Sequence, residues 1–393
     1  MTMRERTGPG TLAVVCVVVA AAALAASGCG GGGGGDDVPE QPAWIESASI
    51  LVPGVGVDNK MCRVDLCPHH ENTDLITWNG AIWLVHRSAV SQILGPNSAL
   101  HIYKSTDSGV TFVHQAKLDA PVDRDIRDPH FYIVGSELHI KALTRLPVVS
   151  SRDSDVDTIA MNTHSSDGVT WSALVAIGPP TWSFWNIEKH GDTLYTAAYE
   201  DGDKSVVMYS STDGLQWTRG ALVYGVSADT PLETELVFMP SGKLLALVRM
   251  DGTDEELLGG SGRLRTKVCW ADPPYAQFTC PDELTGQRLD GPVSWLWNGR
   301  LFVLARKHIA GTRKRTALFE ITGTLEGGPI GIREWGEVPS AGDTAYGGVA
   351  ALGGSRFVIT WYSGELARND TWGVGILRPT DIWKATLDLS KLK

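Results

Sequence analysis

The sequence predicts an all-β fold, a six-bladed β-propeller of four-stranded antiparallel blades, and three observations carry this prediction. Apolar, strand-like segments fold back on themselves around tight turns at a nearly constant interval. Short segments rich in β-branched or aromatic residues follow these hairpins. Helical periodicity is scarce throughout the chain, so helices are not expected to build its core.

The hairpins are the clearest of these signals. Each consists of two apolar runs joined by a connection that contains glycine, as in TDLITWNGAIWLVHR at residues 73–87. Glycine tolerates the positive φ that a two-residue hairpin turn requires. The turns are 51 to 57 residues apart, and their glycines are Gly80, Gly135, Gly191, Gly242, Gly299 and Gly354. This regular spacing predicts six repeated units rather than a sandwich.

Each unit has room for further strands after its hairpin. The expected third strands are SALHIYKS, DTIAMNTHS, SVVMYSS, TKVCWA and TALFEIT. Near the C-terminus, WGVGILR and WKATLDL are the last expected strands. We expect the ring to be closed by strands from these segments and from the segment before residue 74. The sequence does not show which of them pair.

Three of the units end in similar turns. Their segments are STDSGVTF at 105–112, SSDGVTW at 165–171 and STDGLQW at 211–217. These resemble Asp boxes, in which the aspartate accepts hydrogen bonds from turn N–H groups and the glycine takes the left-handed conformation. The aspartates are Asp107, Asp167 and Asp213, and the aromatic residues are expected to pack between blades, away from any active centre.

A six-bladed propeller with Asp boxes resembles the proteins of the sialidase superfamily, and the resemblance covers roughly residues 70 to 390. In that family a glutamate opens a strand and an arginine ends the return strand. Glu235 and Arg249 occupy those places in LETELVFMPSGKLLALVRMDG, with a surface ion pair as the alternative. Arg306 in RLFVLARK and Tyr346 in GDTAYGGV continue the family order, although a tyrosine packed on the rim is the alternative.

The resemblance implies a chemistry for these residues. Sialic acid has a carboxylate on its anomeric carbon, which would repel a carboxylate nucleophile. A neutral phenol such as Tyr346, with Glu235 taking its proton, avoids this repulsion. The guanidinium groups of Arg249 and Arg306 match the two oxygens of the substrate carboxylate.

The first two units complete the expected site. Asp128 precedes proline in DIRDPHFYIV, which is similar to the pocket-lining Asp-Pro of sialidases, and Arg127 and His130 flank it. The first unit lacks the arginine that sialidases place before their first strand, so Arg87 is expected to supply that guanidinium. The loop at 88–98 contains no acidic residue, so the acid/base must come from elsewhere. Asp128 is the expected one, with His130, Asp74 or no proton donor at all as the alternatives.

The sequence therefore predicts an exo-acting, retaining glycoside hydrolase that releases a terminal acidic sugar. A non-catalytic carbohydrate-binding propeller at the cell surface and a polysaccharide lyase on the same scaffold are the alternatives. No cofactor or metal is expected, although the acidic loop SRDSDVD at 151–157 leaves a calcium site open. No basic run indicates a nucleic-acid partner, and we expect a monomer.

The N-terminus indicates export. Residues 1–28 combine two arginines with an apolar run typical of a signal peptide, and Ala-Ser-Gly before Cys29 resembles a bacterial lipobox. We expect lipidation of Cys29, a glycine-rich tether over 29–43 and the propeller over 44–393. This predicts a lipoprotein of the outer membrane or cell surface, with an ordinary secreted protein as the alternative.

Four cysteines remain in the expected propeller. They form two sequence-local pairs, and an exported chain with an even number of cysteines favours disulfides. The expected bonds are Cys62–Cys67 and Cys269–Cys280, with a zinc site as the alternative.

Overall fold

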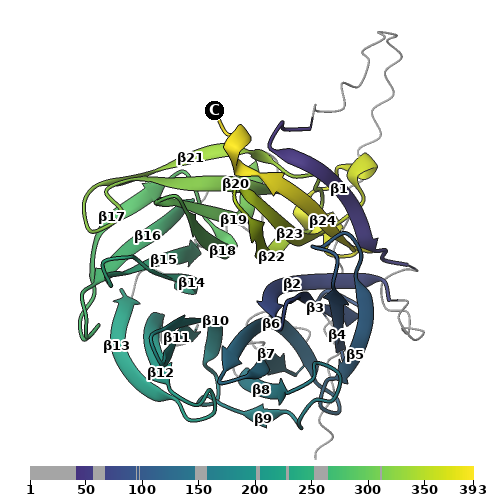
Figure 1. The fold of residues 1–393 in the computed structure, drawn as a ribbon, viewed down its shortest axis with the longest axis horizontal. Helices are drawn as coiled ribbons and strands as arrows, with labels where there is room; N and C mark the ends of the chain where they lie inside the picture. The colour runs from purple at the N-terminus through teal and green to yellow at the C-terminus, as the bar shows by residue number, and fades with distance from the viewer. Residues whose placement is uncertain are drawn as a thin grey trace, which may run out of the picture. The chain divides into compact units, whose positions relative to one another are not determined.

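The computed structural model describes residues 41–55, 67–93, 95–96, 98–146, 157–200, 204–226, 230–251, 264–309 and 312–393. In this part of the chain, six four-stranded antiparallel sheets surround a common centre, which confirms the predicted β-propeller (Figure 1). The expected signal peptide, Cys29 and the tether up to residue 40 lie outside the described residues. No helix among the described residues has the length and apolar character needed to cross a membrane.

We number the sheets as blades 1 to 6, and in blades 1 to 5 the strands follow chain order from the centre outward (Figure 1). Blades 1 and 2 contain β2 (His69–Trp78), β3 (Ala81–Ala89), β4 (Ala99–Ser105) and β5 (Val113–Asp119), then β6 (Asp125–Val134), β7 (Glu137–Arg145), β8 (Ile159–Ser165) and β9 (Val175–Ala176). Blades 3 and 4 contain β10 (Ser183–His190), β11 (Thr193–Glu200), β12 (Ser205–Ser211) and β13 (Thr218–Gly225), then β14 (Thr230–Phe238), β15 (Leu244–Asp251), β16 (Arg265–Ala271) and β17 (Thr279–Thr285). Blade 5 contains β18 (Asp290–Trp297), β19 (Arg300–Ile309), β20 (Arg313–Gly323) and β21 (Ile330–Glu337).

Blade 6 closes the ring with strands from both ends of the domain. Its strands are β22 (Thr344–Gly353), β23 (Arg356–Ser363), β24 (Asp381–Asp388) and, outermost, β1 (Ile45–Val52). The antiparallel pairing of β1 with β24 joins the N-terminal segment to the last blade. This pairing shows which of the segments expected near the two ends close the ring.

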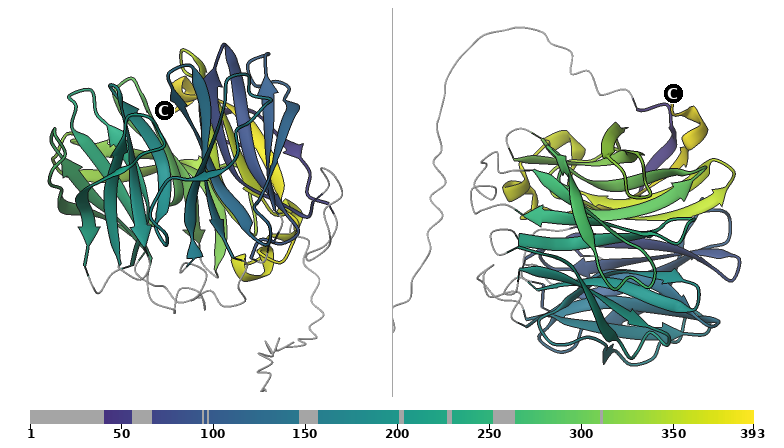
Figure 2. Two further views of the ribbon diagram at one scale, coloured as in Figure 1. Left: turned by 90° about the horizontal axis from the view of Figure 1, so that it is seen from below. Right: turned by 90° about the vertical axis from the view of Figure 1, so that its left-hand side faces the viewer.

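One expected strand was wrong. The segment WGVGILR contains the short helix α1 (Trp372–Gly375) and lies in the connection between β23 and β24. The indole N–H of Trp372 donates to Asp343 Oδ1 at 3.0 Å, which ties this connection to the start of blade 6. Figure 2 shows this C-terminal helical segment, in yellow, at one face of the ring.

The predicted hairpins and third strands are confirmed. Each hairpin joins the first two strands of a blade, and its turn contains a glycine with positive φ, for example Gly80 at 72°. The five segments predicted as third strands correspond to β4, β8, β12, β16 and β20. Two short 3₁₀ helices, Leu366–Arg368 and Leu389–Lys391, complete the described secondary structure.

The three aspartate turns follow the third strands of blades 1, 2 and 3, and each packs against the preceding blade. Asp167 Oδ1 accepts the N–H groups of Val169 and Thr170 at 2.8 and 2.7 Å, and the other two turns have similar bonds. A Cβ added at Gly168 would lie 2.1 Å from the ring of Trp83 in blade 1, so the turn packs directly against the neighbouring blade. Adjacent blades also share apolar clusters, such as Trp83 with Phe131 between blades 1 and 2.

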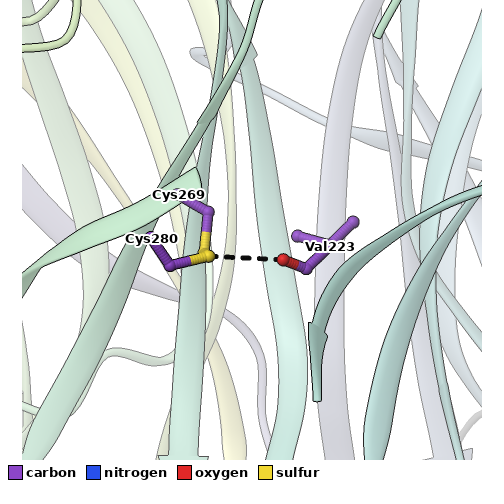
Figure 3. Close-up of a disulfide and its surroundings, with 3 residues drawn as sticks. All are labelled: Val223, Cys269 and Cys280. Atoms are coloured by element: carbon purple, nitrogen blue, oxygen red, sulfur yellow. Dashed lines mark hydrogen bonds between the residues drawn. A yellow bond between two sulfur atoms is a disulfide. The ribbon is translucent and has the colours of Figure 1, made fainter. Parts of the chain in front are cut away.

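The second predicted disulfide is present. Cys269 of β16 and Cys280 of β17 are bonded, and Cys280 Sγ lies 3.3 Å from the carbonyl oxygen of Val223 in blade 3 (Figure 3). Cys67 is also disulfide-bonded. Its predicted partner, Cys62, lies outside the described residues.

Candidate active site

A bulge interrupts the innermost strand of every blade. The register of the innermost pair shifts between Glu71 and Thr73, Arg127 and His130, Phe184 and Ile187, Pro231 and Thr234, Asp290 and Val293, and Ala345 and Gly348. A bulge redirects the side chains of its extra residues. Because six bulges occur at corresponding places around the ring, their residues converge on its centre. Those that line a common pocket include Asn72, Asp128, Trp185, Asn186, Gly291, Pro292 and Tyr346.

Tyr346 lies in the bulge of blade 6, and its hydroxyl meets a carboxylate and a guanidinium. The hydroxyl donates to Glu233 Oε1 at 2.6 Å. Arg249 Nη1 donates to the hydroxyl oxygen at 3.2 Å and pairs with Glu233 Oε2 at 2.8 Å. Burial and the negative charge of Glu233 hold the pKa of Tyr346 well above its usual value. The free site therefore contains a neutral phenol with a proton acceptor and a cation already in place.

The surroundings fix the position of the Tyr346 ring. The backbone of Tyr346 has a φ of 51°, and Thr73 Oγ1 donates to its carbonyl oxygen at 3.2 Å. The edge of Trp185 contacts its ring at a centroid distance of 5.9 Å, and the guanidinium carbon of Arg306 lies 5.1 Å from the ring centroid. A positive φ in a bulky residue stores strain that the structure around it must hold.

The carboxylate beside Tyr346 is Glu233, and the prediction that Glu235 fills this place was wrong. Glu233 belongs to the bulge of β14, and its Oε2 accepts the N–H of Gly291 at 2.8 Å. Glu235 lies past the bulge, where it accepts the N–H and the hydroxyl of Ser294, both at 2.8 Å. Burial raises the pKa of Glu235. Glu235 is thus a buried structural carboxyl rather than a partner of the phenol.

Two of the predicted arginines lie beside Tyr346. Arg249 and Arg306 both line a larger cavity of about 200 Å³, together with Tyr346. Arg249 is held by Asp251 at 2.7 Å, and Arg306 by Asp343 at 3.0 Å. Their side chains are fixed by these carboxylates and can present the remaining donors to an anion without reorganising.

Arg87 does not reach the cavity, which corrects its predicted role. Its side chain is completely buried between Glu71, at 2.7 Å, and Asp125, at 2.9 Å, and it donates to the carbonyl oxygen of Ser91. It joins blade 1 to blade 2 and does not line either described pocket. The guanidinium groups that blade 2 presents to the cavity belong to Arg127 and to Arg145, which the sequence analysis did not select.

Asp128 lies where both pockets meet. It occupies the bulge of β6 with a φ of 49°, its carboxylate accepts from Asn72 Nδ2, and its carbonyl accepts from Lys141 Nζ at 2.9 Å. Burial raises the pKa of Asp128 despite the nearby charge of Arg127. A carboxyl of this kind can keep a proton at a higher pH than an exposed one and then donate it.

His130, predicted as a substrate-binding residue, shares a pocket with Asp128 and Tyr346. It lines the smaller pocket and not the larger cavity. Its Nδ1 is 3.1 Å from Asp74 Oδ2, and its Nε2 is 3.2 Å from the carbonyl oxygen of Ile187. Burial alone would lower the pKa of His130, but Asp74 raises it. No cluster of His, Cys, Asp or Glu suited to a metal ion occurs among the described residues.

Tyr362 and Trp372 also line the cavity, and the sequence analysis missed both. Tyr362 is the second-last residue of β23, and its hydroxyl accepts from Arg306 Nη2 at 2.9 Å. A repeated signal would have found part of the missing set, because the second strands of blades 1, 2, 4 and 5 each end near an arginine. These arginines are Arg87, Arg145, Arg249 and Arg306.

No family model matches the chain, and no curated protein matches it. Solved structures with a similar fold include a protein of unknown function from Dyadobacter fermentans, at 15% identity and a TM-score of 0.59, over 88% of this chain and all of that one. The NanB sialidase of Streptococcus pneumoniae is similar at 11% identity and a TM-score of 0.62, over 87% of this chain and 71% of NanB.

A Trypanosoma rangeli sialidase in complex with 2,3-difluorosialic acid, described as a covalent intermediate, is similar at 12% identity and a TM-score of 0.62. The match covers 88% of this chain but spans only 59% of the sialidase chain. At these identities the likeness establishes the shared six-bladed fold alone.

Proposed function

We propose that this chain is an exo-acting glycoside hydrolase that releases a terminal acidic sugar, sialic acid or a related 2-keto acid, with retention of configuration. The observation that carries the proposal is the hydrogen bond of 2.6 Å from the Tyr346 hydroxyl to Glu233, with Arg249 at 3.2 Å from the same oxygen. Sialidases with the same fold, one of them in complex with 2,3-difluorosialic acid, support the choice of substrate class.

In the first step, Tyr346 Oη attacks the anomeric carbon while its proton passes to Glu233. The glycosidic bond breaks, and the leaving oxygen takes a proton from Asp128. This step produces a glycosyl–tyrosine intermediate, a protonated Glu233 and an ionised Asp128. Arg249 is placed to stabilise the negative charge that develops on the phenol oxygen, because it already donates to that atom.

In the second step, Asp128 takes a proton from water, and the resulting hydroxide attacks the same carbon. The bond to Tyr346 breaks, the phenol recovers its proton from Glu233, and the sugar leaves. Two displacements at one carbon retain its configuration. The raised pKa of Asp128 suits the acid role, and the loop at 88–98 offers no competing carboxyl.

A phenol is a suitable nucleophile for this substrate class. The cavity presents Arg249 and Arg306 beside Tyr346, and both can bind a carboxylate on the reacting carbon. A neutral nucleophile then meets no like charge, and the proton is removed only as the new bond forms.

A glycan-binding propeller without turnover is the second candidate. One observation favours it, since the carboxylate of Asp128 is already held by Asn72. A hydrogen bond that a carboxylate accepts from a side-chain amide stabilises its ionised form, which does not carry the proton that a donor needs. Binding without product formation distinguishes this candidate from the hydrolase.

The site of action follows from the N-terminal sequence. We propose that the protein is exported, lipidated at Cys29 and displayed on the outer membrane or cell surface, where it meets terminal sugars of glycans. The basic and apolar residues before Cys29 support this proposal.

The experiment is hydrolysis of a fluorogenic sialoside by the wild type, Tyr346→Phe, Glu233→Gln and Glu235→Gln. We expect release by the wild type and losses of about 10²–10⁴-fold for Glu233→Gln, as is usual when a general base is removed. Tyr346→Phe should lose at least as much. Glu235→Gln is the matched control on the same strand and should keep most of the activity.

Equal turnover by Tyr346→Phe and the wild type would refute the mechanism. Saturable binding of the sialoside without any released product would favour the binding propeller.

A further inference from the structure

Blade 2 contributes two arginines to the cavity. Arg127 comes from β6 and Arg145 from the end of β7, and both line the cavity of about 200 Å³ that contains Tyr346. In a ring of six blades the second lies opposite the fifth, which carries Arg306 (Figure 1). The cavity therefore has guanidinium groups on two opposite walls.

The charges of this pair are poorly balanced by the protein. The fully buried Asp125 is shared by three arginines, with Arg87 at 2.9 Å, Arg127 in hydrogen-bonding contact and Arg145 at 3.8 Å. Glu71 pairs with Arg87 at 2.7 Å and attracts Arg127 only from a greater distance. Asp125, already bonded to Arg87, is thus the carboxylate that pairs with both cavity-lining guanidiniums of blade 2, and Asp128 attracts them only from a greater distance.

Of the three arginines that share Asp125, Arg145 has the fewest close contacts with protein acceptors. Within the described part of the chain, its guanidinium has the ion pair of 3.8 Å with Asp125 and no hydrogen bond to a protein acceptor. Its side chain is 20% exposed, so bulk water reaches it only in part. Burial, followed by the like charge of Arg127, lowers the pKa of Arg145 to about 10. A partly buried cation without a close partner is destabilising until an anion binds it.

The arginines beside Tyr346 differ in this respect. Arg249 has Glu233 at 2.8 Å and Asp251 at 2.7 Å, and Arg306 has Asp343 at 3.0 Å. The guanidinium groups on the blade 2 side of the cavity therefore have fewer close protein carboxylates than those beside the nucleophile.

We propose that Arg127 and Arg145 form a second anion subsite, and that the natural sugar acid carries a second oxyanion there. This rests on the proposed function, in which the first carboxylate binds Arg249 and Arg306. The second group is a carboxylate or a sulfate ester, on the part of the sugar that points away from the carbon that Tyr346 attacks. The subsite would select doubly charged sugar acids over singly charged ones.

The test is binding of matched free sugars to the full chain, measured by calorimetry. The pairs are sialic acid with its 8-O-sulfate ester, glucuronic acid with its 2-O-sulfate ester, and gluconate with the dicarboxylate glucarate. We expect the doubly charged member of at least one pair to bind about tenfold to one hundredfold more tightly, which is the usual strength of one or two charge-assisted hydrogen bonds.

The variants are Arg145→Gln, Arg145→Lys and the control Arg219→Gln, which removes an exposed arginine from β13 in blade 3. Arg145→Gln should abolish the preference, Arg145→Lys should keep part of it and Arg219→Gln should keep all of it. A preference for the sulfated or for the dicarboxylate member supports the subsite and identifies the oxyanion.

Two results would overturn the proposal. One is the absence of any preference for a doubly charged sugar across the three pairs. The other is an equal loss of affinity for both members of a pair in Arg145→Gln, which would mean that Arg145 holds the single carboxylate. Free sugars are bound without turnover, so a protein that binds them as expected but hydrolyses nothing would refute the proposed hydrolase and leave the subsite standing.

Discussion

The bulge of blade 5 leaves no room for a side chain beneath the nucleophile. Gly291 has a φ of 56°, and a Cβ built on it would lie 2.7–2.8 Å from three carbons of the Tyr346 ring. Its N–H also donates to Glu233. The substitution Gly291→Ala should therefore disturb both members of the phenol–carboxylate pair at once.

The expected magnitude has two parts. An alanine with left-handed φ destabilises the fold by about 1–2 kcal/mol. Carbon atoms in contact prefer about 3.5–4.0 Å, so the Tyr346 ring must move by roughly 1 Å. A displacement of this size in a reacting group reduces turnover by about 10²-fold.

Gly299→Ala is the control in the same blade. Gly299 has a φ of 74° in the hairpin between β18 and β19, and a Cβ there would meet no atom within 4 Å. Urea unfolding and sialoside turnover should be measured for both variants. Both should lose the stability cost of the positive φ, Gly291→Ala should lose more because its Cβ also overlaps the Tyr346 ring, and only Gly291→Ala should lose turnover. Wild-type turnover by Gly291→Ala, or an equal loss in Gly299→Ala, would refute the reasoning.

Two further predictions concern stability. His70 is buried, and burial lowers its pKa to about 3, so the unfolded chain binds more protons than the folded chain between about pH 3 and 6.5. Stability should fall as the pH drops through this range, by up to about 5 kcal/mol for this residue, and urea midpoints should show a shallower fall in His70→Gln. Gly168→Ala should destabilise the fold by about 2–4 kcal/mol, because its Cβ would overlap the Trp83 ring, whereas Gly135→Ala, with open space around it, should lose only the cost of its positive φ. Equal urea midpoints for these two alanine variants would contradict the packing of that turn.

The architecture could be predicted from the sequence because its signals are local and repeated. A glycine turn between apolar runs forms a hairpin in any context, and six of them at one period leave few folds that fit. The closure of the ring was different, since the pairing of β1 with β24 joins residues more than 300 positions apart. No local pattern distinguishes the strand that pairs there from others near the ends.

The outline of the site could be predicted from the sequence, but two of its residues were assigned wrongly for a physical reason. The positions of Tyr346, Arg249 and Arg306 around one cavity follow from strand order, because strand ends at one face of a propeller converge. The choice between Glu233 and Glu235 depends on where β14 bulges, and the residues themselves do not mark that position. Arg87 is buried away from the cavity, where Glu71 and Asp125 neutralise it, and both contacts exist only in the folded chain.

The central claim is that Tyr346 forms a bond to the sugar. The most direct measurement is mass spectrometry of the intact protein and of its peptides after incubation with 2,3-difluorosialic acid and related difluorinated 2-keto sugar acids. The account predicts one added sugar, located on Tyr346, and no adduct with Tyr346→Phe. An adduct on another residue, or none with any of these sugars at saturating concentration, would contradict it.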